Sequence, residues 1–163
     1  DIAPRTFFNY FPTKEAALLG EMPMVPTQEA VARFVSGGPN GSLFPDLGAL
    51  LADQFADFSG DRELHELRHS VFKDSPQLSK MHFANMREME ARFGDLIRRR
   101  LDADAQRRGR TVGDADAELL AAIAGATMRS AFMSWTRIAD ETPIAERIRW
   151  AFTNVNRVID EYR

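Results

Sequence analysis

Cysteine is absent from this chain of 163 residues. The chain therefore has no disulfide framework and no thiolate chemistry, which is typical of a protein in the reducing cytoplasm. No segment reaches the roughly 18 consecutive apolar residues of a membrane-spanning helix, and the sequence has neither a charged-then-apolar leader nor a lipidation signal. We therefore expect a cytoplasmic protein that does not associate with membranes.

Signatures of the common catalytic sites are missing as well. No glycine-rich phosphate loop and no nucleophile elbow occurs, and His82 has no Ser or Asp partner in a recognisable frame. A single histidine on an apolar stripe is more typical of a core or pocket polar group than of a catalyst. The sequence therefore predicts a protein that is not an enzyme and needs no cofactor.

One segment does match a catalytic pattern, namely His65-Glu66-Leu67-Arg68-His69. It fits H-E-x-x-H, in which two histidines one helical turn apart bind zinc and the glutamate activates water. The extended pattern that would supply a third ligand does not follow, and Arg68 would bring a positive charge beside the metal. A zinc-dependent hydrolase is therefore kept as an alternative, whereas the preferred interpretation has no metal site.

The remaining composition favours a helical fold. Hydrophobic residues make up 44% of the chain, enough for a sizeable core in one or two domains. Apolar residues recur at helical spacing between glycine- and proline-rich breaks such as 37–41. The segments predicted to be helical are 14–20, 28–35, 47–58, 64–72, a long helix from Pro76 to about 101, 114–138 and 143–162.

Arginines are concentrated in the segment 98–110, directly after the long apolar stripe. Cations favour the C-terminal ends of helices, and two aspartates interrupt the run. We therefore interpret these arginines as a solvated helix end and loop, not as a nucleic-acid patch.

The segment 4–15, Pro-Arg-Thr-Phe-Phe-Asn-Tyr-Phe-Pro-Thr-Lys-Glu, predicts a short helix, a tight turn and the start of a second helix. Phe7 and Phe11 are four residues apart and would face a core, which leaves the polar residues outside. Pro12 ends the first helix, and Thr13 is suited to cap the next one. An outer surface so rich in hydrogen-bond donors favours contact with phosphates and bases.

This stretch closely resembles the recognition-helix signature of the TetR family of transcriptional regulators. The resemblance implies a helix-turn-helix whose second helix enters the major groove of DNA. It implies that Arg5 and Asn9 reach base edges and that Thr6 and Tyr10 touch phosphates. Lys14 would hold the DNA backbone from the following helix.

A helix-turn-helix needs another helix before residue 4, and the net charge of −3 is unusual for a DNA-binding protein. We therefore expect the first helix, much of the second and any basic arm to lie upstream of this sequence. The expected fold is all-α, with a truncated N-terminal helix-turn-helix head in 1–26 and a helical ligand-binding and dimerisation domain in 27–163. A proline-flanked hinge is expected in 20–27.

A pocket for a small apolar effector is expected inside the larger domain. The seven methionines of the chain offer adaptable, polarisable surface that suits loosely selective ligands. The expected apolar lining is Phe55, Phe58, Phe72, Met86, Met89, Phe93, Met128, Phe132 and Trp135, with His82, Asn85 and Thr127 orienting the ligand.

The last two predicted helices indicate a second copy of the chain as partner. The segment 114–138 is apolar nearly all round, which predicts burial on two sides, and Trp150 lies off the apolar stripe of its helix. We expect a homodimer through a four-helix bundle, as the resemblance also implies. Its interface is expected to include Ile123, Ser130, Met133, Trp150, Asn154 and Arg157.

The expected function is therefore ligand-responsive regulation of transcription. A dimeric repressor would bind a palindromic operator on double-stranded DNA, and a small apolar effector would release it. Besides the hydrolase, a helical carrier of apolar ligands without a DNA role stays open as an alternative.

Overall fold

The computed structural model describes residues 26–56, 67, 70, 75–109, 111, 113–138 and 140–162. Within these residues the fold is all-α, as predicted, with five helices and no strand. The helices are α3 (Gln28–Val35), α4 (Leu43–Asp53), α6 (Pro76–Arg108), α7 (Asp114–Arg137) and α8 (Ile144–Glu161). None of the helices described is both long and apolar enough to span a membrane.

Local capping explains several helix ends. The Thr27 side chain accepts a hydrogen bond from the Ala30 N–H at the start of α3. Ser75 does the same for Leu78 at the start of α6, where Pro76 occupies the first turn. Gly109, with φ +61°, ends α6 in the left-handed conformation that glycine adopts without strain.

The helix predicted over 47–58 has different bounds in the structure. α4 begins before Leu47, at Leu43, and ends at Asp53. The chain then continues as a turn in which the Phe55 N–H donates to the Ala52 carbonyl, 2.9 Å away. Phe55 is nevertheless buried, so the apolar pattern continues into the core beyond the last residue of the helix.

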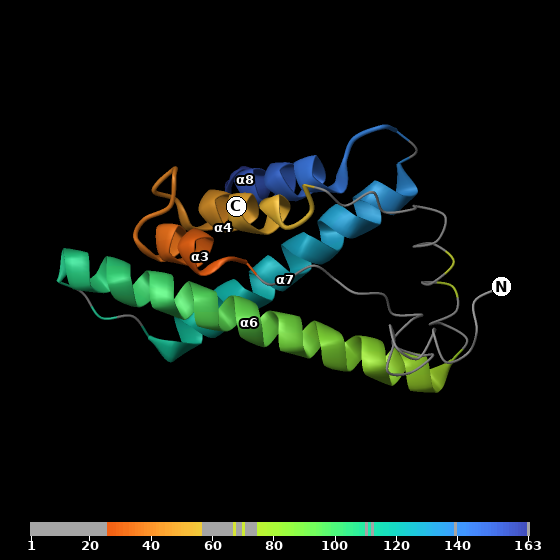
Figure 1. Cartoon of the computed structure of the whole chain (residues 1–163), viewed down its shortest axis with the longest axis horizontal. Coiled ribbons are helices and arrows are strands. Elements are labelled where there is room, and N and C mark those ends of the chain that lie inside the picture. The colour runs from red at the N-terminus through yellow and green to blue at the C-terminus, as the bar shows by residue number, and fades with distance from the viewer. Residues whose placement is uncertain are drawn as a thin grey trace.

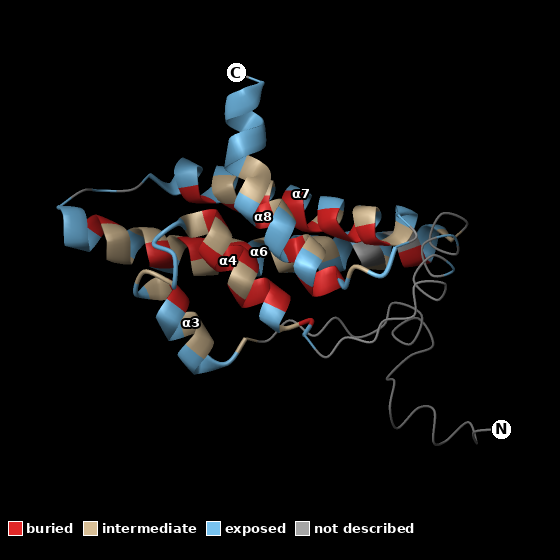
Figure 2. Ribbon diagram, turned by 90° about the horizontal axis from the view of Figure 1, so that it is seen from above, coloured by how far each residue is buried: buried red, intermediate tan, exposed pale blue. Residues whose placement is uncertain are grey.

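The five described helices pack against one another in adjacent pairs (Figure 1). α8 lies against both α4 and α7, and α7 in turn crosses the long α6. The short α3 packs against α4 and α6. In the second view the last turns of α8 extend beyond the other helices and are coloured as exposed (Figure 2).

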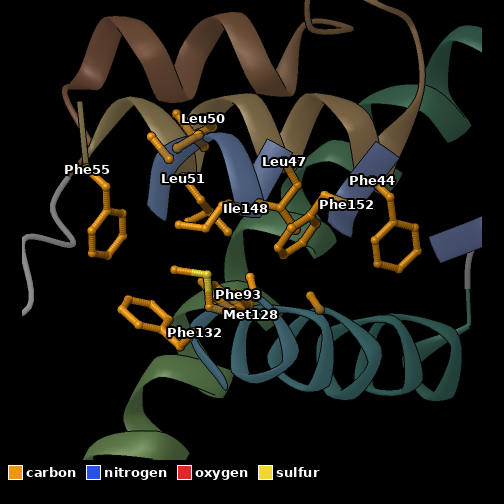
Figure 3. Packing of buried hydrophobic residues seen from close by; sticks show 14 of the residues in the cluster. Phe44, Leu47, Leu50, Leu51, Phe55, Phe93, Met128, Phe132, Ile148 and Phe152 are labelled. Carbon is orange, nitrogen blue, oxygen red and sulfur yellow. The ribbon is translucent and has the colours of Figure 1, made fainter. Parts of the chain in front are cut away.

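The inner faces of these helices share one hydrophobic core. Leu47 of α4, Ile148 and Phe152 of α8, and Ile97 of α6 are fully buried, and Met128 of α7 is 1% exposed. Figure 3 shows Leu47, Met128, Ile148 and Phe152 meeting between the helices, and Ile97 belongs to the same cluster. Burial of this apolar surface is the main force that holds the helices together.

The interpretation of the arginine-rich segment 98–110 as a solvated helix end was wrong for one residue. α6 continues to Arg108, so the first arginines of the segment lie inside the helix. Arg99 is exposed, but the side chain of Arg100 is only 2% exposed and faces α3 and α4. A buried cation requires partners, and these come from distant parts of the chain.

Candidate functional site

Several predicted site residues lie outside the part of the chain that the structure describes. These include all five predicted DNA contacts, Arg5, Thr6, Asn9, Tyr10 and Lys14. They also include both histidines of the H-E-x-x-H segment. Leu67 is the one residue of this segment that the structure describes, and it is 61% exposed. Among the described residues, no group of three or more His, Asp or Glu side chains is placed to hold a metal ion.

Most of the described apolar residues of the predicted pocket come together in the core. Phe55 contacts Phe132 edge to face with ring centroids 5.5 Å apart, and Phe132 meets Trp135 in the same way at 6.4 Å. Phe93 and Met128 belong to the same cluster (Figure 3). Edge-to-face contacts of this kind stabilise packed aromatic groups.

The other predicted pocket residues occupy more varied positions. Met89 is partly buried against the core, Met86 is partly buried, and Asn85 is exposed. Thr127 is 8% exposed, and its hydroxyl donates to the Ile123 carbonyl of its own helix at 2.8 Å. Phe58, Phe72 and the side chain of His82 lie outside the described residues.

The outer side of α7 carries exposed apolar side chains. Leu119 and Met133 are 63% and 62% exposed, and small residues lie between them at helical spacing. Ala122, Ala126 and Ser130 are all exposed. A stripe with large residues at its ends and small ones between them allows another helix to approach closely.

The outer side of α8 also carries exposed side chains. Trp150 is 63% exposed, Val158 is 41% exposed and Tyr162 is 83% exposed. Together with Asn154 they form one row at four-residue spacing, which is a ridge of the kind that packs into the groove of a neighbouring helix. The Asn154 amide donates to the Trp150 carbonyl at 2.8 Å, which fixes the polar residue of the row.

A polar contact joins the two exposed sides. Arg147 of α8 donates to the Ser134 hydroxyl of α7 at 2.7 Å and to Asp140 at 2.6 Å. The hydrogen bond from Arg147 keeps the pKa of the Asp140 carboxyl below its ordinary value, and the Thr142 N–H contributes to the same shift.

The hydrogen bond from Arg147 to Ser134 brings α7 and α8 together close to the two exposed rows. Ser134 lies one turn after Ser130, and Arg147 lies one turn before Trp150. We call the combined surface the outer face. Its residues are Leu119, Ala122, Ile123, Ala126, Ser130, Met133, Trp150, Asn154 and Val158.

The outer face includes five of the six residues predicted for a dimer interface. Ile123 is partly buried against the core, so it contributes only an edge to this surface. Arg157, the sixth, is exposed and donates to Asn154 at 3.0 Å and to Glu161 at 2.8 Å, beside the face.

The predicted interface did not include Leu119, Ala122, Ala126 or Val158. Leu119, Ala126 and Met133 follow one another at seven-residue intervals, and this repeat was a usable signal. Arg100 and Asp46 gave no comparable signal, because nothing in their local sequence marks them as partners.

Comparisons of this chain with protein-family models, with curated proteins and with solved structures find no match. The residues themselves therefore carry the functional argument.

Proposed function

We propose that this chain is part of a homodimeric, ligand-responsive regulator of transcription of the TetR type, with a repressor as the expected form. The structural observation that carries the dimer is the outer face of α7 and α8. The DNA-binding part rests on the residue pattern of the segment 4–15.

The outer face has the composition of a protein interface. Met133 and Trp150, both more than 60% exposed, are large apolar anchors of the kind that carry binding energy. The small side chains of Ala122 and Ala126 lie between the anchors, and polar groups such as Arg157 lie beside them. An apolar centre with a polar rim is the usual anatomy of a specific interface.

A second copy of the chain is the partner that fits this surface most simply. Most homo-oligomers are dimers with two-fold symmetry, in which the same patch is used by both subunits. Two α7–α8 pairs placed face to face would make a four-helix bundle, whose helices pack at about 20°. The dimer would bury the apolar outer side of α7, so that this helix would be buried on two sides, as its sequence predicts.

A two-fold axis also suits the proposed DNA-binding role. Two N-terminal heads related by the axis can engage successive major grooves roughly 34–36 Å apart on a palindromic site. The effector would bind among the aromatic side chains near Phe132 and shift the population between DNA-competent and incompetent dimers. To lower the DNA-competent fraction of the dimers from about 99% to about 1%, the effector must bind the incompetent state more tightly than the competent state by roughly 5.5 kcal/mol.

Introducing charge at the outer face tests the dimer. Met133→Glu and Trp150→Glu each place a carboxylate at the centre of the proposed interface, whereas Gln106→Glu adds the same charge at an exposed position of α6. Analytical ultracentrifugation over a concentration series should give a dimer for the wild type and Gln106→Glu. Both interface variants should dimerise at least tenfold more weakly, which corresponds to about 1.4 kcal/mol or more. A wild type that is still monomeric at about 100 µM, roughly the dissociation constant of a weak interface, would exclude the proposed dimer.

The DNA role is tested separately in the full-length protein. Arg5→Ala and Asn9→Ala should each cost about 1–3 kcal/mol in binding to the specific operator and relax the preference for particular bases. Unchanged DNA binding in both variants would reject these residues as base contacts. A dimer that binds an apolar ligand but no DNA would favour the carrier alternative.

A further inference from the structure

Arg100 of α6 lies at the centre of a buried polar network. Its side chain is 2% exposed, and that of Asp46 on α4 is fully buried. The guanidinium donates to Asp46 at 3.3 Å, to the Phe34 carbonyl at 2.5 Å and to the Gly37 carbonyl at 2.9 Å. Its Nε donates to Asp104 at 3.0 Å, so one side chain connects α6 with α3, the following loop and α4.

The carboxylate of Asp46 organises the other half of the network. Its two oxygens accept the backbone N–H groups of Asn40 at 2.8 Å and Ser42 at 3.1 Å. Together with the donor from Arg100, the carboxylate therefore has three hydrogen bonds. A buried ion pair is compatible with a stable fold when its remaining donors and acceptors are satisfied in this way.

Glycine allows the loop 36–42 to close over this pair. Gly38 has φ +57°, and a Cβ at this position would overlap the Asp46 side chain. Gly37 also has a positive φ, and its carbonyl accepts from Arg100. The backbone of the loop is thus shaped around the carboxylate.

The C-terminal end of α3 depends on the same network. The Phe34 carbonyl belongs to the last turn of α3, where a positive charge is favourable for the helix dipole. The guanidinium also lies 5.5 Å from the centre of the Phe34 ring. Phe34 is the buried residue of α3, so Arg100 contacts the part of α3 that anchors it to the core.

We infer that the Arg100–Asp46 network is a latch that fastens α3 and the loop 36–42 to α6 and opens as one cooperative unit. When the latch opens, α3 and the loop leave α6 while α7 and α8 stay folded. In the proposed regulator α3 is the first helix of the sensor domain, directly after the segment 1–26, so the latch sets how firmly the start of this domain is held on α6. The latch itself does not depend on the DNA-binding role.

Amide hydrogen exchange of the full chain tests the latch. Asp46→Asn and Arg100→Gln should accelerate exchange of the Asn40 and Ser42 amides and of the last turn of α3 by roughly tenfold or more. Amides of α7 and α8 should keep their rates within about twofold. The matched control is Arg98→Gln, which removes an arginine of the same helix whose partner Asp114 is exposed and should change none of these rates.

A second route opens the latch from the loop. Gly38→Ala should produce the same local pattern, because its Cβ displaces Asp46 without altering Arg100. If the variants accelerate exchange equally in every helix, or in none, the network is not a separately opening unit. If the variants fail to fold, amide exchange of the wild type in low urea replaces them. The free energy of opening measured for the latch amides must then be lower than that of the α7 amides. Equal opening free energies would overturn the latch.

Discussion

Two helix crossings in this fold contain a glycine, but the helices approach each other differently. Where α4 crosses α8, a Cβ on Gly48 would overlap the side chain of Phe152. Where α6 crosses α7, a Cβ on Gly94 would lie 3.7 Å from the Cβ of Ala121, which is ordinary van der Waals contact. A Cβ at Gly48 thus has no room at the first crossing, whereas a Cβ at Gly94 has room at the second. The second crossing also contains Gly125 of α7, where a Cβ would lie 3.0 Å from the Cγ atom of Glu90.

The chemistry of the two crossings differs as well. The α4–α8 crossing is apolar at its centre, and its ion pair between Arg149 and Asp53 lies at the exposed edge. The α6–α7 crossing includes an ion pair between Glu90 and Arg129 at 3.0 Å, with both side chains more than a third exposed. We infer that close packing fixes α8 on α4, whereas the α6–α7 contact around Gly94 has room for a small side chain.

The largest effect should follow from removing a ring at the apolar crossing. Phe152→Ala deletes a fully buried side chain and should lower the free energy of unfolding by about 3–5 kcal/mol. Urea denaturation at one fixed protein concentration measures this loss. Thr153→Ala, at the adjacent exposed position, should stay within about 0.5 kcal/mol. Similar losses in both variants would contradict the assigned burial.

A smaller loss is expected when a methyl group is added to the same crossing. Gly48→Ala should destabilise the protein by about 1–3 kcal/mol, because the helices must separate to accommodate the Cβ. The better helix propensity of alanine offsets only part of this cost. The same denaturation measurement applies, and a more stable variant would show that the crossing is looser than described.

The same substitution at the other crossing should have the opposite sign. Gly94→Ala should increase the free energy of unfolding by about 0.5–1 kcal/mol, because alanine is the better helix former and the Cβ has room. Measured beside Gly48→Ala, it gives a direct comparison of the two crossings. A loss of stability at position 94 would show that α6 and α7 are packed as tightly as α4 and α8.

The smallest effect concerns Asp104, near the end of α6 and away from both crossings. Partial burial acts to raise the pKa of its carboxyl, but hydrogen bonds and charges from Arg100 and Arg107 outweigh burial and lower it. A carboxyl with a lowered pKa stabilises the fold above its unfolded pKa of about 3.9, and this contribution disappears as the pH falls through the folded pKa.

Unfolding measured against pH tests this titration. The wild type should exceed Asp104→Asn in stability by up to about 1 kcal/mol at neutral pH, and the gap should narrow below about pH 4. Asp102→Asn is the control, because that neighbouring carboxyl is exposed. A gap that does not change with pH would show that charge is not the cause.

Local sequence signals predicted much of the fold. The bounds of α3 were predicted as found, and those of α7 and α8 within one residue, because caps, prolines and apolar spacing act over a few residues. The end of α4 was not predicted, since Phe55 continues the apolar spacing in a turn. The long α6 extends through the arginine run beyond its apolar stripe.

The long-range contacts could not be obtained in this way. The carbonyls that accept from Arg100 are 66 and 63 residues away in the chain, so nothing near Arg100 indicated its burial. Exposed residues such as Met133 and Trp150 could be identified from helical spacing, because spacing reports which side of a helix a residue occupies. The predicted DNA contacts lie outside the described residues and remain predictions.

The closed loop around Asp46 has an evolutionary consequence. A side chain at position 38 would collide with the carboxylate, and loss of the carboxylate would leave the buried Arg100 without its countercharge. Relatives of this chain should therefore keep Gly38, Asp46 and Arg100 together or lose them together. This covarying trio, spread over 63 positions, would identify distant homologues whose surfaces have otherwise diverged.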